Sequence, residues 1–359
     1  MKKKLNFAQS IKMISTLNIK TQIYSIFFIG LLLSACNRHK KVDVSNIHID
    51  VTIERFDKDF NALGVKPMNQ QVTFLENKYG IFYRDFLALI LQVDDINVKD
   101  TAYFQNVRDV LKAQPYLDLK HDVDSVYPNV DKQNAELTDA FRRIKYYFPQ
   151  QKLPKVYAYF SGFQAQTTIG NGYIGVGLDL FLGANSRFYP ALTEAYPRYM
   201  SRNFTPDNIT PRVVETMLRE NMFPENDDNG TLLTKMIYNG KIMYMMDQLL
   251  PDVQDSVKIQ YTTKQLAWCN KFESSIWGYF LDQNLLYETD YPKIQKYLTV
   301  APFTPGVGEN NESAPKLGIW IGWQIVRKYM DKHPDITLPR LMAETDEQKI
   351  LSDSKYHPK

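Results

Sequence analysis

The stretch TTIGNGYIGVGLDLFLG, residues 167–183, decides how the rest of the chain is interpreted. Its glycines Gly170, Gly172 and Gly175 match the spacing Gly-x-Gly-x-x-Gly, which in dinucleotide-binding proteins follows a strand and opens a helix that holds the pyrophosphate. Here strand-like residues follow Gly172 instead. The pair Asn171-Gly172 favours a two-residue hairpin turn, because both residues tolerate positive φ. The stretch therefore predicts a β-hairpin, and we expect no nucleotide site.

Around this hairpin, apolar residues alternate in a few short segments, which predicts strands near residues 48–56, 155–161, 164–170 and 173–180. Elsewhere apolar residues recur at three- and four-residue spacing, which predicts helices over residues 72–91, 104–113, 135–149, 192–202, 209–223, 231–249, 263–287, 292–299, 316–331 and 338–345. The pattern predicts an α+β fold, predominantly α-helical, with a small antiparallel or mixed sheet that carries the hairpin at Asn171-Gly172.

The charge of the chain is concentrated at its N-terminus. The 359 residues contain 43 Lys and Arg against 40 Asp and Glu. Residues 1–35 contain five of the lysines and no acidic residue, so the remainder carries 38 basic and 40 acidic side chains. A body so close to neutral gives no electrostatic reason to expect a nucleic-acid partner.

The N-terminal lysines precede an apolar run, Ile23–Ala35, which is too short to span a bilayer as a helix. The run ends in LSAC, Leu33–Cys36, and this motif resembles a bacterial lipobox, in which the cysteine is acylated at the membrane surface. We therefore predict a lipoprotein signal peptide over residues 1–35, a lipidated tether over 36–46 and a single globular domain over 47–359. The alternative is an ordinary signal peptide with an accidental cysteine.

The helix predicted over Thr210–Phe223 follows the small sheet, as the active helix of a zincin metalloprotease does. When Glu215 is aligned with the general base of H-E-x-x-H, the two histidine positions become Val214 and Leu218, which cannot bind zinc. No histidine occurs between His121 and His333. We therefore predict no metal ligand, no catalytic residue and no cofactor, and we expect Glu215→Gln to leave the protein nearly unaffected.

The segment LGIWIGWQIVRKYM, Leu317–Met330, contains the small-residue step Gly318 to Gly322. We interpret it as a close helix–helix contact in a core rather than a membrane span, because the apolar run is short and ends in basic residues. Trp320 and Trp323 are then expected to fill core positions. As neighbours on a helix they would alternatively present part of an aromatic patch to a partner.

Several segments, in this order, resemble the gliding motility lipoprotein GldB family. They are the lipobox, IERFDKDF (Ile53–Phe60), YIGVGLDLFLGANSRFYP (Tyr173–Pro190), GIWIGWQIVRKYM (Gly318–Met330) and DEQKILSDSKYHPK (Asp346–Lys359). The resemblance implies a cell-envelope lipoprotein needed by a gliding and type IX secretion apparatus. It also implies distant similarity to predicted zinc proteases that carry H-E-x-x-H, so we expect a degenerate zincin-like core.

The function expected from these observations is that of a non-catalytic lipoprotein that binds other gliding or secretion proteins of the envelope. Its contact with the membrane would be the N-terminal lipid, with the periplasmic face of the outer membrane as the expected location. Two alternatives stay open. One is a lipid-anchored zincin-like hydrolase whose site uses carboxylates such as Glu215, Glu220 or Asp179, and the other is a lipoprotein that binds a glycan or a peptide.

Replacing Cys36 by serine tests the anchor. Without the thiol no diacylglycerol can be attached, so the precursor should accumulate unprocessed and should not be recovered as a mature membrane protein. Metabolic labelling with a palmitate analogue, together with fractionation of the envelope, measures both effects. Mature protein of normal size in the membrane fraction of the Cys36→Ser strain would show that Cys36 is not the anchor.

Overall fold

The computed structural model describes residues 41–64, 67–92, 101–225 and 230–359, so the predicted signal peptide and Cys36 lie outside the described residues. The chain divides into the segment Met1–Asp43 and a body, Val44–Lys359. Only the body is considered below. Val44, which we assigned to the tether, is already buried in this body.

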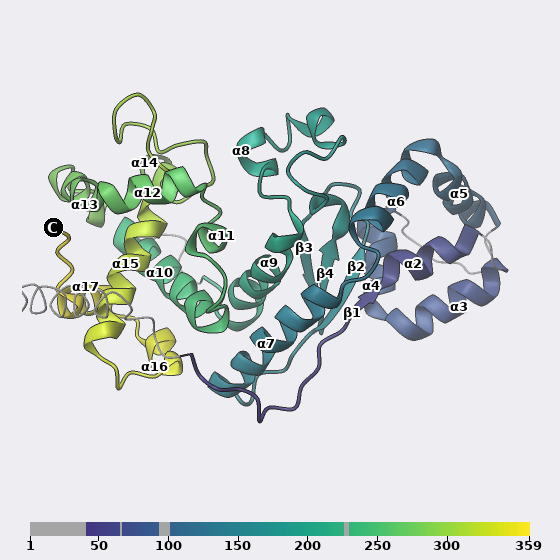
Figure 1. Cartoon of the computed structure of the whole chain (residues 1–359), viewed down its shortest axis with the longest axis horizontal. Coiled ribbons are helices and arrows are strands. Elements are labelled where there is room, and N and C mark those ends of the chain that lie inside the picture. The colour runs from purple at the N-terminus through teal and green to yellow at the C-terminus, as the bar shows by residue number, and fades with distance from the viewer. Residues whose placement is uncertain (1–40, 65–66, 93–100, 226–229) are drawn as a thin grey trace, which may run out of the picture. The chain divides into compact units, whose positions relative to one another are not determined.

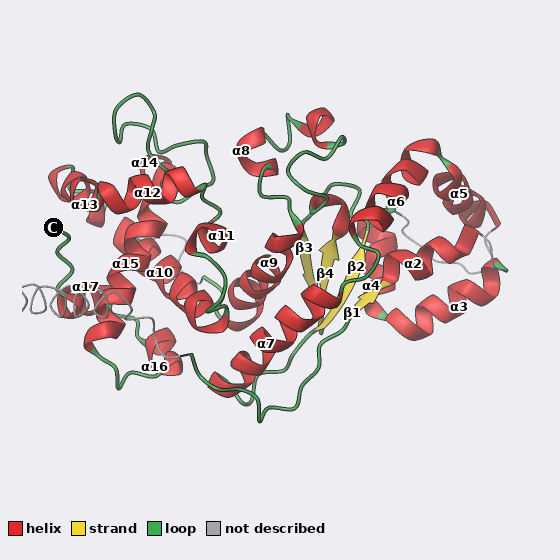
Figure 2. Ribbon diagram, viewed as in Figure 1, coloured by secondary structure: helices red, strands yellow, loops and turns green. Residues whose placement is uncertain are grey.

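The body is mostly helical, as predicted (Figure 2). Its helices are α2 (Phe56–Asn61), α3 (Met68–Tyr79), α4 (Ile81–Asp85), α5 (Thr101–Lys112), α6 (Gln114–Val126), α7 (Asp131–Tyr147), α8 (Arg198–Ser201), α9 (Ile209–Thr216), α10 (Leu232–Leu249), α11 (Asp255–Ile259), α12 (Thr263–Lys271), α13 (Glu273–Asp282), α14 (Tyr291–Ile294), α15 (Leu317–Lys332), α16 (Leu338–Ala343) and α17 (Glu347–Ser354). The helix predicted over 263–287 is two helices that meet at Phe272, and the one predicted over 192–202 is only the single turn α8.

The four strands form a mixed sheet in the order β1-β2-β4-β3. They are β1 (Ile53–Arg55), β2 (Lys155–Tyr159), β3 (Thr167–Gly170) and β4 (Tyr173–Gly177). The first three in sheet order are parallel, and β3 pairs antiparallel with β4. This pair is the predicted hairpin, with Gly172 at φ +81°. Because strand β4, and not a helix, follows the turn, the nucleotide-loop interpretation is wrong.

Strand β1 is shorter than the segment 48–56 that we predicted, because α7 takes up the backbone groups before it. The Ile53 amide donates to Asn134 Oδ1 (2.8 Å), and the Val51 amide donates to Thr138 Oγ1 (2.9 Å). Arg142 Nε donates to the Ile49 carbonyl (2.9 Å). The three partners are spaced four residues apart, so their side chains lie on one face of α7. The distance between successive partners along the helix is close to the distance between every second residue of an extended chain. Residues 49–53 are therefore extended, but they are held by helix side chains.

The sheet separates two hydrophobic clusters. Val156 and Ala158 of β2 point into one cluster, and their neighbours Tyr157 and Tyr159 point into the other, as the alternation of a strand requires. Figure 1 shows α2, α3 and α4 beside one face of the sheet and α7 and α9 beside the opposite face. On the α2–α4 side Phe82 packs against the tyrosines of β2, with ring centroids 4.7 and 5.6 Å away.

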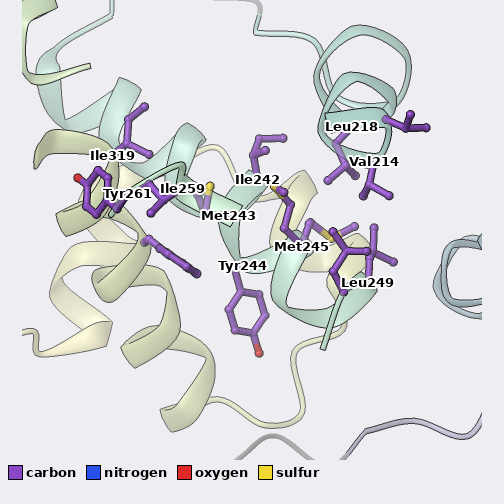
Figure 3. Packing of buried hydrophobic residues seen from close by; sticks show 14 of the residues in the cluster. Val214, Leu218, Ile242, Met243, Tyr244, Met245, Leu249, Ile259, Tyr261 and Ile319 are labelled. Carbon is purple, nitrogen blue, oxygen red and sulfur yellow. The ribbon is translucent and has the colours of Figure 1, made fainter. Parts of the chain in front are cut away.

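Helices α10 and α15 touch through their backbones, which confirms the close helix–helix contact expected from the glycine step. A methyl group on Gly240 would overlap the backbone of Gly322, and a methyl group on Gly322 would overlap the carbonyl of Met236. Most side chains of α10 are buried (Figure 3), which is typical of a helix at the centre of a core. Among the described residues, no helix is both long enough and apolar enough to cross a membrane.

Gly322→Ala should therefore destabilise the body, because the new methyl group meets the backbone of α10, which cannot rotate away. Overpacking of this kind costs about 1–3 kcal/mol, occasionally more. Gly278→Ala is the matched control, because the space around Gly278 in α13 is open and alanine is the better helix former by about 0.5–1 kcal/mol. Urea unfolding of both variants measures the difference, and equal stabilities would contradict the contact.

Candidate functional site

The helix that we aligned with a zincin active helix is α9, and it continues beyond Thr216 as a π-helical turn, Met217–Met222. Thr216 joins α9 to the edge strand of the sheet, because its hydroxyl lies 2.7 Å from that of Thr167 in β3. The helix therefore lies directly beside the hairpin.

Val214 and Leu218, which occupy the positions of the two histidines, are completely buried. Figure 3 shows them on α9 next to Ile242, Met245 and Leu249 of α10. Side chains of this kind contribute about 1.5–3 kcal/mol each when they are removed from water. The face of α9 that would hold a metal in a zincin therefore stabilises the core.

Glu215 lies on a different face of α9, where it forms ion pairs with two arginines of the same helical segment. It accepts hydrogen bonds from Arg212 Nη1 and from Arg219 Nε (2.9 Å), and 19% of its side chain is exposed. Burial by itself raises the pKa of this carboxyl. The neighbouring cations, Arg212 first, outweigh burial and bring the pKa to about 2. The Glu215 carboxylate is therefore ionised at neutral pH, and it is a weak base.

This geometry leads us to expect a larger effect of Glu215→Gln on stability than the sequence alone indicates. The substitution would leave the buried guanidinium of Arg212 without its counter-charge. Removing one partner of a buried ion pair costs about 3–5 kcal/mol, because the other charge stays behind.

Further cations gather around this ion pair from distant parts of the chain. Lys316, at the N-terminus of α15, is buried, and the charges of Arg202, Arg212 and Arg219 act on its ammonium together with that of Glu215. Two successive backbone carbonyls at the end of α11 accept hydrogen bonds from side chains of this group. Arg212 Nη2 donates to the Lys258 carbonyl (2.6 Å), and Lys316 Nζ donates to the Ile259 carbonyl (2.7 Å). We call Arg202, Arg212, Glu215, Arg219 and Lys316 the α9 charge cluster.

The sequence analysis did not identify the arginines and Lys316 of this cluster. The spacing Arg212, Glu215, Arg219 places all three side chains on one helical face, so this part could have been found by inspection. Lys316 could not, because it is about a hundred residues away in the sequence.

The other predicted site residues are dispersed. Asp179 is fully buried and accepts hydrogen bonds from the Ser161 amide (2.8 Å), the Ser161 hydroxyl (3.0 Å) and the Phe163 amide (2.6 Å), so it anchors the turn after β2. Glu220 is exposed. Within the described ranges, no three His, Cys, Asp or Glu side chains are grouped so that they could hold a metal ion.

Trp320 and Trp323 both lie in the core, with 1% and 0% of their surface exposed. The indole Nε1 of Trp323 donates to Asp247 Oδ2 (2.8 Å), and the Arg327 guanidinium lies 3.8 Å from the centre of the indole ring. The structure thus places these rings in helix packing and not on a surface that a partner could reach.

A separate pocket of about 410 Å³ opens beside α10. It is lined by Glu225, Lys235, Asn239, Tyr291, Leu298 and Thr299. Lys235 Nζ lies 3.3 Å from Glu225 Oε1, and Asn239 Nδ2 donates to the Lys235 carbonyl (2.8 Å). The lining is mostly polar, with one aromatic ring, and no local sequence pattern points to it.

Lys316 should make the stability of the body depend on pH. Burial lowers the pKa of its ammonium to about 7, against the opposing effect of Glu215, while the unfolded chain keeps a value near 10.5. Between these values the unfolded state binds more protons, so the free energy of unfolding should rise with pH, by up to about 1.4 kcal/mol per unit. Urea unfolding at pH 7, 8 and 9 measures the slope. Lys316→Met should flatten it and the exposed Lys264→Met should not, whereas an unchanged slope in Lys316→Met would contradict the assignment.

A comparison with known families bears on the identity of the chain. The family model of the gliding motility protein GldB matches residues 37–358. No curated protein and no solved structure matches the chain. The family match covers nearly all of the 359 residues and includes the hairpin, α9 and α15. The chain therefore belongs to the GldB family of gliding motility lipoproteins.

Proposed function

We propose that this protein is a non-catalytic accessory component of a gliding motility and type IX secretion machinery and that it acts by binding other envelope proteins. The observation that carries the proposal is the packing of α9. The positions that would hold a metal in a zincin are filled by Val214 and Leu218, which are packed against α10. Catalysis by a zincin needs an open polar cleft at this point, because the metal must bind water and substrate together.

The state of Glu215 supports the same proposal. A general base works best when its pKa lies near the operating pH. With a pKa of about 2 and two arginines bound to it, Glu215 has little tendency to accept a proton at neutral pH. Its ion pairs with Arg212 and Arg219 instead stabilise one face of α9. The alternative of a zincin-like hydrolase would need Glu215 to be released from both arginines.

We further propose that the protein is anchored through acylated Cys36 on the periplasmic face of the outer membrane. The family membership supports an association with the envelope, and the lipobox that ends at Cys36 supports the anchor. The matched range begins directly after this cysteine, at residue 37.

The pocket beside α10 favours the second candidate function, the binding of a glycan or a peptide. Its volume is within the usual range for small-ligand sites, about 300–1,000 Å³. Tyr291 offers an aromatic ring, and Asn239 and Thr299 offer amide and hydroxyl groups, a combination that suits a polar ligand with an apolar face. A bound saccharide or peptide in purified protein would support this function.

A charge-rescue experiment separates a structural Glu215 from a catalytic one. Glu215→Gln should lose about 3–5 kcal/mol of stability and, through lower abundance, reduce gliding. The double variant Glu215→Gln/Arg219→Gln should recover part of both, because it removes one of the uncompensated cations. Complementation of a deletion strain, with protein levels measured in the membrane fraction, gives the result. A double variant that is abundant and folded but does not support gliding would favour catalysis.

Protein binding itself is tested by crosslinking in living cells. If the proposal holds, the wild-type protein should crosslink to another envelope component whose deletion also abolishes gliding or secretion. Trp323→Ala should lose this crosslink, because removing a buried tryptophan side chain costs about 3–5 kcal/mol. A wild-type protein that supports gliding without any such crosslink would contradict the proposal.

A further inference from the structure

The α9 charge cluster contains more positive than negative charge. The charges of Arg212, Arg219 and Lys316 act on a single carboxylate, that of Glu215, and the charge of Arg202 acts on Lys316. With all four cations protonated the excess is three positive charges, and with Lys316 neutral it is two. The carbonyls of α11 that accept from Arg212 and Lys316 are dipoles, so they satisfy donors but do not cancel this charge. Uncompensated charge of this size is costly in a buried setting.

The same region contains donors without acceptors. Two buried guanidinium nitrogens of the α9 charge cluster, Arg202 Nε and Arg212 Nε, have no hydrogen-bond partner in the part of the chain that the structure describes. Arg212 is more than nine-tenths buried. A buried unsatisfied donor is rare in folded proteins and calls for a ligand or a water molecule.

We propose that the α9 charge cluster is a binding site for a phosphate group. Water would accept hydrogen bonds from the orphaned donors but would leave the excess positive charge in place. An anion would accept these hydrogen bonds and also reduce the excess positive charge. A dianionic phosphate cancels two positive charges, and a carboxylate cancels only one. Guanidinium groups also match phosphate oxygens with paired hydrogen bonds. The inference does not depend on the proposed binding of envelope proteins.

Two side chains of the cluster are partly exposed to solvent. Arg202 is half-buried, and 23% of the Arg219 side chain is exposed. Arg202 also donates from Nη2 to Gln265 Oε1 (2.8 Å), which leaves its Nε as the orphaned donor. The Nε atoms of Arg202 and Arg212 are themselves buried, so we expect an anion to reach them through a local movement of the partly exposed side chains of Arg202 and Arg219.

Thermal unfolding of the lipid-free body in the presence of inorganic phosphate tests the site. The unfolding midpoint should rise in a saturable manner, by about 2–4 °C at ten times the dissociation constant. Sodium acetate and sodium chloride at matched ionic strength should give a smaller rise. A linear, unsaturated increase with phosphate would indicate general salt exclusion from the surface and would overturn the proposal.

Two variants assign the effect to the α9 charge cluster. Lys316→Met and Arg202→Gln should each weaken phosphate binding by about tenfold or more, since each removes a charge-assisted contact. Arg187→Met, which removes an exposed positive charge elsewhere, should bind phosphate as the wild type does. If both cluster variants fold and still respond to phosphate like Arg187→Met, the site is not in this cluster and the proposal fails.

Discussion

The backbone contact between α10 and α15 at Gly240 and Gly322 is the constraint on which most of the body depends. It holds α10 in the middle of the core, so that one side of this helix is free to pack against α9. It also fixes the start of α15 and thereby brings Lys316 to the α9 charge cluster. Trp323, one residue beyond Gly322, reaches Asp247 of α10 through the same contact. A side chain at Gly240 or Gly322 would push α10 and α15 apart and would disturb all of these contacts at once.

The sequence predicts those parts of the fold that have local causes. The turn at Asn171-Gly172 was predicted because two residues define its geometry, and the glycine contact because small residues at four-residue spacing leave room for a second helix. The length of β1 was not predictable, because it depends on α7 side chains about eighty residues away. Helix α11, with five residues, is too short to show a period.

Of the candidate site, only the part that lies on α9 itself can be read from the sequence, through the spacing of Arg212, Glu215 and Arg219. Val214 and Leu218 are visible in the sequence as apolar residues where a zincin has histidines. The burial that turns Lys316 and Arg212 into neighbours follows from packing between elements that no local pattern connects.

The extended run of residues 49–53 along α7 has a mechanical consequence. This run lies a few residues after the start of the body at Val44, and its backbone is hydrogen-bonded to Asn134, Thr138 and Arg142 on one helix face. A force that pulls the N-terminal side of the chain parallel to these extended residues loads the three hydrogen bonds at the same time, in shear. It does not open them one after another. Tension on the chain segment that precedes this run would therefore pass into α7, a helix of 17 residues, through Ile49 and Val51 before it reaches β1 at Ile53.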